Sequence, residues 1–413
     1  MNTLSPARVR LALLALALGG FGIGSTEFVA SGLLPQIAAD LFPAVDSVDH
    51  AQAIAQSGWM ITAYAAGVVV GAPTIAVFAA RMPRRGLLVA LVAAFILGSI
   101  ASAVAPDFPT LVAARFLAAL PHGAYFGIAS LVAGSLMGPG KQGRGISIVL
   151  TGLTIANVIG VPAITFLGQQ AGWRVAYVAV AAVFALALVA ILFAVPGSPG
   201  DPGATVKREL GGFRRGEVWL ALLTGVVGFG GLFAVQSYIA PMTTQLTQLP
   251  AVIVPVVLVV FGVGMTIGNW LGGPLADRHA VRAIVLSFIG SAASFVVLIA
   301  VASTPVGLFV GIFLMAVASS VLAVAIQTRL LEVARESQTL AAAVNHSGLN
   351  LGNSLGAVLG GLVIAGGYGY ASTAWVGLLL CVPGVALALL GALITRRASD
   401  RAPVDQNEPA GAS

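Results

Sequence analysis

The chain has 413 residues, of which 58% are hydrophobic and only 8% are charged, whereas a typical soluble domain has about 25% charged residues. This composition excludes a soluble globular protein and predicts an integral membrane protein. The net charge of +6 would suit nucleic-acid binding only if the basic residues clustered on one face or arm. They are spread over short loops, so we expect no nucleic-acid partner. The single cysteine, Cys381, leaves no intramolecular disulfide and no cysteine-based metal site.

Twelve apolar stretches are long enough to cross a bilayer, which takes about 18 or more residues. In chain order they cover residues 11–34, 54–79, 86–105, 110–136, 146–168, 174–195, 218–241, 251–275, 283–302, 305–328, 339–365 and 371–395. We therefore predict an all-α integral membrane protein with twelve transmembrane helices. Its expected location is the inner (cytoplasmic) cell membrane, which the chain would cross several times.

The Lys and Arg residues fall almost entirely into one set of predicted loops, the set that includes both chain ends. This set holds 18 of the 20, the opposite loops hold only Arg174, and Arg115 lies within a span. Because loops rich in Lys and Arg stay in the cytoplasm, both termini are predicted to be cytoplasmic.

The two halves of the chain repeat one another. Residues 151–160 align without gaps on residues 347–356, and a similar offset places Ala80-Arg81 on Asp277-Arg278. An even number of spans per half makes this a parallel repeat, whose halves can rock about a shared central site. The predicted units are an N-terminal six-helix half (1–195), a cytoplasmic linker (196–217), a C-terminal six-helix half (218–396) and a disordered cytoplasmic tail (397–413).

Glu27 is the only ionisable residue between Leu11 and Leu34. An acidic residue at mid-helix costs about 2.5–3.5 kcal/mol on insertion scales, so it should face a protein interior or a water-filled cavity. Such a residue is by default a candidate functional site. We predict that Glu27 carries the proton of a proton-coupled transporter.

Arg115 in the fourth span lies at a depth similar to that of Glu27. A rise of 1.5 Å per residue places both side chains about 10 Å below the outer surface, where they could pair. A neighbouring guanidinium favours the ionised carboxylate and burial favours the neutral acid, so making and breaking the pair would switch proton affinity. Alternatively, the pair is static and fixes helix packing, or Arg115 reaches the outer headgroups.

Two histidines also lie inside predicted spans. His122 is near the middle of the fourth span, where an imidazole could relay a proton or sense substrate. A histidine that is hydrogen-bonded between helices is the alternative. His346 lies beside Asn345, Asn350 and Asn353 in the eleventh span, and for it a polar cluster that bonds neighbouring helices is the favoured interpretation.

A set of aromatic and polar residues is the candidate lining of a substrate cavity. Small-molecule sites are mostly apolar with a few hydrogen-bonding groups, although aromatic residues in membrane helices often face only lipid or neighbouring helices. The predicted lining consists of Phe28, Tyr125, Phe233, Gln236, Tyr238, His346 and Asn350.

Two further segments predict conformational gating. Residues 273–282 resemble the conserved loop motif of the major facilitator superfamily, whose acid and arginines are thought to latch helix ends; the first-half copy has Ala80 in place of the acid. The fifth span resembles part of the glycine- and proline-rich antiporter motif of that superfamily. Loop charges that obey the positive-inside rule and simple small-residue packing are the alternatives. The gating candidates are Arg81, Arg85, Gly152, Gly160, Pro162, Gly273, Asp277 and Arg278.

Taken together, the motifs resemble the drug/proton antiporter branch of this superfamily, and in particular its arabinose-efflux-permease-like and chloramphenicol-type exporters. The residues that carry the likeness are Thr26-Glu27-Phe28, Gly32-Leu-Leu-Pro35, Gly71-Ala-Pro73, Pro121-His122-Gly123, Gly152 to Pro162 and Gly172-Trp173-Arg174. The resemblance implies a proton-coupled exporter of drugs, sugars or related metabolites that works by alternating access. The expected partners are a small-molecule substrate, protons and the lipid bilayer, and we expect a functional monomer without a cofactor.

Two other functions stay open, and a third is disfavoured. A proton-coupled importer would use the same fold and Glu27, although the glycine-rich fifth span argues against it. A membrane receptor would have no need for a lone carboxylate near an intramembrane arginine. No constellation of nucleophile, base and orienting group points to an enzyme.

Gly140-Lys141 lacks the rest of a phosphate-binding loop, so ATP is not expected to supply energy. The acidic outer loop with His50 matches no metal site.

Overall fold

The computed structural model describes residues 5–79, 82–137, 142–197, 216–334 and 338–400, and every regular element within these ranges is helical. Twelve spans in this part of the chain are long and apolar enough to cross a membrane. Each of them overlaps one predicted span, so the twelve-helix architecture is confirmed. The predicted linker lies almost wholly outside the described residues, as do residues 401–413 of the predicted tail.

The N-terminal half provides six spans, three of which are interrupted. Its elements are α1 (Pro6–Leu41), α2 (Pro43–Asp46), α3 (His50–Ser57) with α4 (Trp59–Ala79), α5 (Arg84–Ala103), α6 (Phe108–Ala119) with α7 (His122–Met137), α8 (Gln142–Ile155) with the π-helix η1 (Ala156–Gly160) and α9 (Val161–Ala171), and α10 (Trp173–Ala194).

The C-terminal half provides the other six spans. Its elements are α12 (Gly216–Gln236) with α13 (Ile239–Pro241) and the π-helix η3 (Met242–Leu246), the 3₁₀ turn η4 (Ala251–Ile253), α14 (Val254–Val301), α15 (Pro305–Ala334), α16 (Gln338–Ala365) and α17 (Ser372–Asp400). Two spans lie within α14, which turns at His279 (φ −158°, ψ 92°). Helix α17 ends at Asp400, so residues 397–400, which were predicted to belong to the disordered tail, are helical.

The outer surface of the bundle is apolar. Phe193 is 80% exposed and Trp270 is 77% exposed, and many leucines and valines of other spans are also outward-facing. Hydrocarbon rather than water suits such a surface, and helices satisfy their own backbone hydrogen bonds there. This requirement explains why long apolar stretches located the spans correctly.

Two prolines account for breaks in the spans. Pro162 has no N–H to donate to the carbonyl of Val158, and the π-helix η1 ends two residues before it. Pro241 likewise leaves the carbonyl of Ser237 without its helical donor, and α12 stops at Gln236 with Tyr238 in a non-helical conformation. Both breaks fall in spans that face the other half of the molecule.

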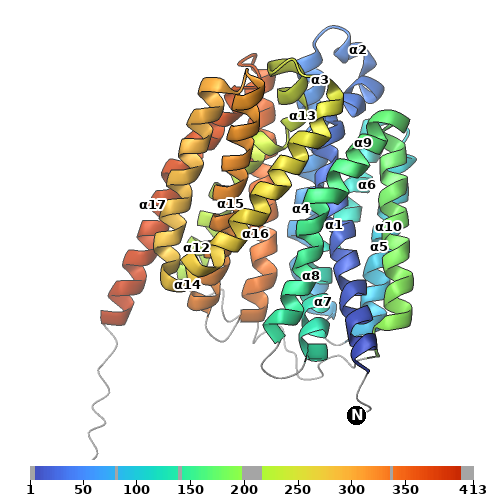
Figure 1. Cartoon of the computed structure of the whole chain (residues 1–413), viewed down its shortest axis with the longest axis vertical. Helices are drawn as coiled ribbons and strands as arrows, with labels where there is room; N and C mark the ends of the chain where they lie inside the picture. Colours follow the sequence, from blue (N-terminus) through green and yellow to red (C-terminus); the bar gives the residue numbers. More distant parts are fainter. Residues whose placement is uncertain (1–4, 80–81, 138–141, 198–215, 335–337, 401–413) are drawn as a thin grey trace, which may run out of the picture.

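The two halves meet near the centre of the bundle and at one of its ends. We call the end where α1 begins and α17 finishes the terminal side; Figure 1 shows the N-terminus there and α2, α3 and α13 at the opposite end. Across the halves, Gln169 Nε2 donates to the carbonyl of Ala251 (3.0 Å). Gly262 of α14 lies so close to the backbone of Asn157 that an added Cβ would be 2.5 Å from its carbonyl oxygen. The side opposite the termini is therefore closed.

Candidate functional site

Arg115 is held inside the N-terminal half by contacts from three other helices. It is 1% exposed, and its guanidinium donates to the Thr26 hydroxyl (2.9 Å) and the Thr26 carbonyl (2.8 Å) of α1. The rings of Tyr64 of α4 and Tyr177 of α10 lie 4.2 and 5.3 Å from the guanidinium carbon. These cation–π contacts and hydrogen bonds stabilise a charge that the membrane interior would otherwise disfavour.

Glu27 lies next to this arginine without bonding to it. The carboxylate is 7% exposed and within electrostatic range of Arg115. In the described part of the chain no ion pair or hydrogen bond joins Glu27 to another residue. The ion pair expected from the equal depths is thus absent in this structure, because the guanidinium is occupied by the preceding residue, Thr26. A nearby cation and a free carboxylate are the components of a site that can take up and release a proton.

His122 begins α7 and lies at the contact between the two halves. It is 1% exposed, and its Nδ1 is 3.3 Å from the hydroxyl of Tyr64. The ring of His346, which comes from α16 in the other half, has its centroid 6.3 Å from that of His122. Phe126 stacks on His346 with centroids 5.2 Å apart and an interplanar angle of 3°. The two predicted histidines therefore belong to one contact.

A second contact between the halves joins α1 to α12. Phe28 and Phe233 stack with centroids 6.1 Å apart and an interplanar angle of 6°. One turn further along α1, the Ser31 hydroxyl donates to Gln236 Oε1 (3.4 Å). Three of the predicted cavity residues thus meet across the halves.

The polar cluster predicted in the eleventh span is largely intrahelical. Asn350 Nδ2 donates to the carbonyl of His346 (3.0 Å) one turn earlier in α16. The side-chain oxygens of Asn350 and Asn353 have no hydrogen-bond donor among the described residues, although both residues are buried. These acceptors are available to a ligand or to water.

The hydroxyls of two predicted cavity residues donate hydrogen bonds to backbone carbonyls in this structure. The Tyr125 hydroxyl donates to the carbonyl of Leu16 (2.8 Å) inside the N-terminal half. The Tyr238 hydroxyl donates to the carbonyl of Ala357 (2.8 Å), and its ring lies against Gly58 of the other half. Tyr238 therefore helps to close the side opposite the termini.

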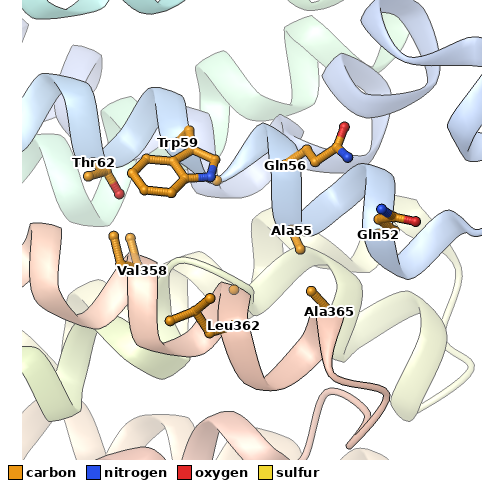
Figure 2. Close-up of a pocket in the computed structure, with 11 residues that line it drawn as sticks. Gln52, Ala55, Gln56, Trp59, Thr62, Val358, Leu362 and Ala365 are labelled. Carbon is orange, nitrogen blue, oxygen red and sulfur yellow. The ribbon is translucent and has the colours of Figure 1, made fainter.

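A cavity of about 240 Å³ lies between α3, α4 and α16, away from Glu27 and His122. Figure 2 shows Gln56, Trp59 and Thr62 on one wall and Val358, Leu362 and Ala365 on the other. Trp59 and Leu362 are more than half exposed, so the cavity opens toward the lipid-facing surface. None of the predicted cavity residues lines it.

The glycine candidates of the fifth span occupy close helix contacts. A Cβ on Gly152 would be 2.0 Å from the backbone oxygen of Ala17, and one on Gly160 would be 2.6 Å from Ser25 Oγ. Both glycines let this span approach α1, as expected of small residues between membrane helices. Pro162 is the second residue of α9, which follows η1.

The loop motif is only partly described. Arg81 and the side chain of Asp277, two of the predicted gating residues, lie outside the described residues. Gly273 has open space around it, and Arg278 is exposed. Arg85 donates to the carbonyl of Leu192 near the end of α10, where cations are favourable for helix stability.

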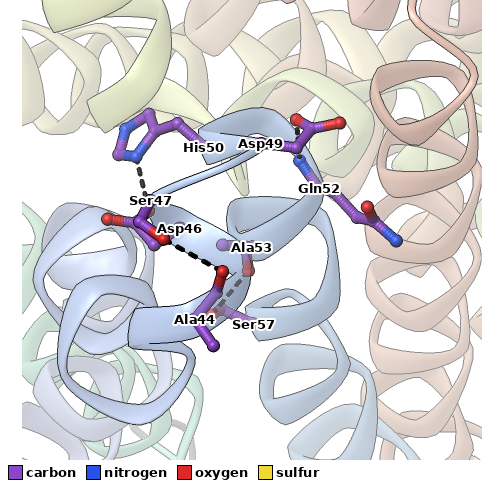
Figure 3. A network of polar contacts seen from close by, with 8 residues as sticks. All are labelled: Ala44, Asp46, Ser47, Asp49, His50, Gln52, Ala53 and Ser57. Atoms are coloured by element: carbon purple, nitrogen blue, oxygen red, sulfur yellow. Dashed lines mark hydrogen bonds and ion pairs between the residues drawn. The ribbon is translucent and has the colours of Figure 1, made fainter.

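The outer loop is a hydrogen-bonded connector. Figure 3 shows His50 Nδ1 against Asp46 (2.5 Å), while Asp49 caps α3 by accepting from the amide of Gln52 (2.9 Å). Arg174, the only basic residue of the loops predicted to lie outside, pairs with Asp40 at the same end. No group of His, Cys, Asp or Glu suited to a metal ion was found in the described ranges.

Tyr64, Tyr177 and Thr26 were not among the predicted coupling residues, yet they are the groups that contact Arg115. The sequence indicates Thr26 only as part of the Thr26-Glu27-Phe28 motif. The one available signal for the tyrosines was that each places a hydroxyl inside an apolar span.

Known proteins resemble this chain over nearly its whole length. The sequence model of the Major Facilitator Superfamily matches residues 16–278 and 247–412. The inner membrane transport protein YdhP of Escherichia coli (strain K12) is 39% identical over 93% of this chain and 96% of its own length. A chloramphenicol resistance protein of Streptomyces lividans is 31% identical over 92% and 95%, respectively.

Among solved structures, that of a D-xylose-proton symporter has the same fold. Its TM-score is 0.71 at 15% identity, over 93% of this chain and 97% of the symporter chain. The chain therefore belongs to the Major Facilitator Superfamily and is a multi-pass transporter of the inner membrane, not an enzyme.

Proposed function

We propose that this transporter exports small organic molecules in exchange for protons, and that Glu27 carries the proton. The observation that supports this most directly is the position of Glu27, a buried carboxylate beside an arginine whose hydrogen bonds go to Thr26. Moving Arg115 from Thr26 to the carboxylate would expel the proton, and moving it back would favour uptake. One small rearrangement would therefore change proton affinity.

Alternating access would expose Glu27 to each side of the membrane in turn, so that the proton is taken up on one side and released on the other. The positive-inside pattern favours a cytoplasmic terminal side, so the closed opposite side would face the exterior. Substrate would then enter from the cytoplasm or inner leaflet in this conformation. The Phe28–Phe233 contact and the free acceptors of Asn350 and Asn353 are the proposed substrate contacts.

Export rather than import is favoured by the glycine-rich fifth span, which packs on α1 through Gly152 and Gly160. The likeness to a chloramphenicol resistance protein agrees with this direction. One proton that moves down its electrochemical gradient releases enough free energy to drive export, about 2.3 kcal/mol per 100 mV and about 1.4 kcal/mol per pH unit. At one-to-one exchange this maintains a roughly several-hundred-fold gradient of a neutral solute.

The first prediction concerns proton release on ligand binding. Purified protein in weakly buffered detergent is mixed with sugars, nucleosides, phenicols and lipophilic cations, and released protons are measured. At least one ligand should release about one proton per protein from wild type and almost none from the Glu27→Gln variant, because substrate and proton compete at this carboxylate.

Glu332→Gln is the matched control, since Glu332 is an exposed carboxylate on α15. It should behave as wild type. A ligand that binds both wild type and Glu27→Gln and releases equal numbers of protons would contradict the assignment of Glu27. Counterflow of the same ligand in oriented vesicles then decides between the exporter and an importer.

A further inference from the structure

We propose that Tyr64 is a positioning residue that ties His122 to the Arg115 site, so that a proton arriving at His122 alters the contact between the two halves. This inference rests on the proposed proton coupling. Its starting point is that the Tyr64 ring lies 4.2 Å from the Arg115 guanidinium carbon while its hydroxyl lies 3.3 Å from His122 Nδ1. One side chain thus contacts both candidate proton sites.

We assign to neutral His122 the tautomer that carries its proton on Nε2, so that Nδ1 accepts a hydrogen bond from the Tyr64 hydroxyl. Protonation of His122 then places a hydrogen on Nδ1, which donates to the hydroxyl instead. Tyr64 is 1% exposed, so no bulk water replaces the lost partner. The hydroxyl hydrogen then has to reorient, and no covalent bond of the tyrosine has to break.

The charges around Tyr64 make protonation of His122 unfavourable when Glu27 is neutral and more favourable when Glu27 is ionised. The titratable and charged groups that surround the network are Glu27 of α1, Arg115 of α6, Tyr177 of α10 and His346 of α16. A cation on His122 adds to the permanent charge of Arg115, and only an ionised Glu27 offsets it. The network therefore favours one proton at a time, on Glu27 or on His122.

The contact between the halves would convert protonation of His122 into a movement of the two halves. His346, which belongs to the other half, has its ring centroid 6.3 Å from that of His122 and stacks on Phe126. A charged His122 is less compatible with this closely packed imidazole, because the positive charge loses solvation there. Protonation should thus shift the population toward separated halves at this level.

Tyr177 supplies a matched control for Tyr64. Its ring also lies over Arg115, at 5.3 Å, but its hydroxyl has no hydrogen-bond partner in the described part of the chain. Tyr64→Phe and Tyr177→Phe each keep an aromatic ring beside the guanidinium and each remove one hydroxyl. Only Tyr64→Phe removes a link to His122.

The test is the distance between two spin labels as a function of pH, with no substrate added. The labels replace exposed residues of the two halves near the terminal side, at Gly86→Cys and Glu332→Cys in a Cys381→Ser background. Wild-type and Tyr177→Phe proteins should change their distance distribution between about pH 8 and about pH 5. In Tyr64→Phe the changing fraction should fall by about two-fold or more.

Equal responses of the Tyr64→Phe and Tyr177→Phe proteins would overturn the proposal, and so would a wild type that does not respond to pH. Thermal unfolding of both variants in detergent checks that neither change merely disrupts folding. The proposed function fails separately, through the ligand-induced proton release of the Glu27→Gln variant. If Glu27 is required for ligand-induced proton release but Tyr64→Phe has no effect on the pH response, the protein exchanges protons without the link through Tyr64.

Discussion

At the scale of single residues, Thr26 determines what Arg115 bonds to, because its hydroxyl and its carbonyl accept the two hydrogen bonds of the guanidinium. Counting from the span ends correctly placed Glu27 and Arg115 near one another. Which atom the guanidinium bonds to depends on the rotation of α1 about its axis, and this rotation presents Thr26. Tyr64 was missed for the same reason, because packing of α4 against α6 and α7 leaves no periodic signal in the sequence.

Asp107, outside the membrane spans, allows a prediction of pH-dependent stability. It caps α6, and hydrogen bonds from the side chain and then the amide of Thr110 hold the pKa of this exposed carboxyl below its ordinary value. A lowered pKa means that the stabilisation is complete above the unfolded value of about 4 and is lost as the pH falls through the lower folded value.

We therefore expect wild type to unfold at a higher temperature than Asp107→Ala at about pH 6, and this difference to shrink below about pH 4. Thermal unfolding in detergent at both pH values measures it. Asp107→Asn is the control: it keeps an oxygen acceptor that does not titrate, so its unfolding should resemble wild type at pH 6. A difference between wild type and Asp107→Ala that grows toward low pH would contradict the sign.

At the scale of elements, the spans were predictable and their interruptions were only partly so. Apolar length locates a span because lipid imposes it on every outward face. Pro162 and Pro241 marked two disturbed spans, but whether a proline produces a kink or a π-helix depends on neighbouring helices. For the same reason the sequence did not reveal that the backbone of Asn157 in η1 contacts Gly262 of the other half.

The tight approach of α8 to α1 predicts a stability effect for Gly152. A Cβ there would be 2.0 Å from the backbone oxygen of Ala17, and backbone cannot move aside without separating the helices. Gly152→Ala should therefore destabilise the protein by about 1–3 kcal/mol. Gly127→Ala in α7 is the control, because nothing lies within 4 Å of its added Cβ.

Thermal unfolding of the two variants in the same detergent gives the comparison. Gly127→Ala should match wild type or slightly exceed it, since alanine favours helices over glycine. Two variants that unfold at the same temperature would mean that α1 and α8 can separate at little cost. In that case Gly152 would be a hinge rather than a packing contact.

At the scale of the whole molecule, the internal repeat and the charge pattern predicted two halves and an orientation, and the comparisons confirm the two-repeat fold. The sequence did not indicate which side is closed, because both conformations must be stable with the same residues. The closed side depends on contacts between halves, such as that between Tyr238 and Gly58. In the proposed alternating-access cycle these contacts break each time the opposite side opens.

A reversible cross-link across this closed side tests the rocking of the halves. An added Cβ on Gly361 of α16 would be 3.6 Å from the carbonyl oxygen of Ala55 in α3, so these two positions are neighbours across the halves and are chosen for paired cysteines. In a Cys381→Ser background, oxidation of the Ala55→Cys, Gly361→Cys protein should abolish counterflow of the ligand found by proton release. Reduction should restore it, and the two single-cysteine variants should be unaffected by oxidant.

Binding from the terminal side should survive in the cross-linked protein, because only the opposite side is held shut. Full counterflow through a completely cross-linked protein would mean that the halves do not separate at α3 and α16 and that substrate takes another path.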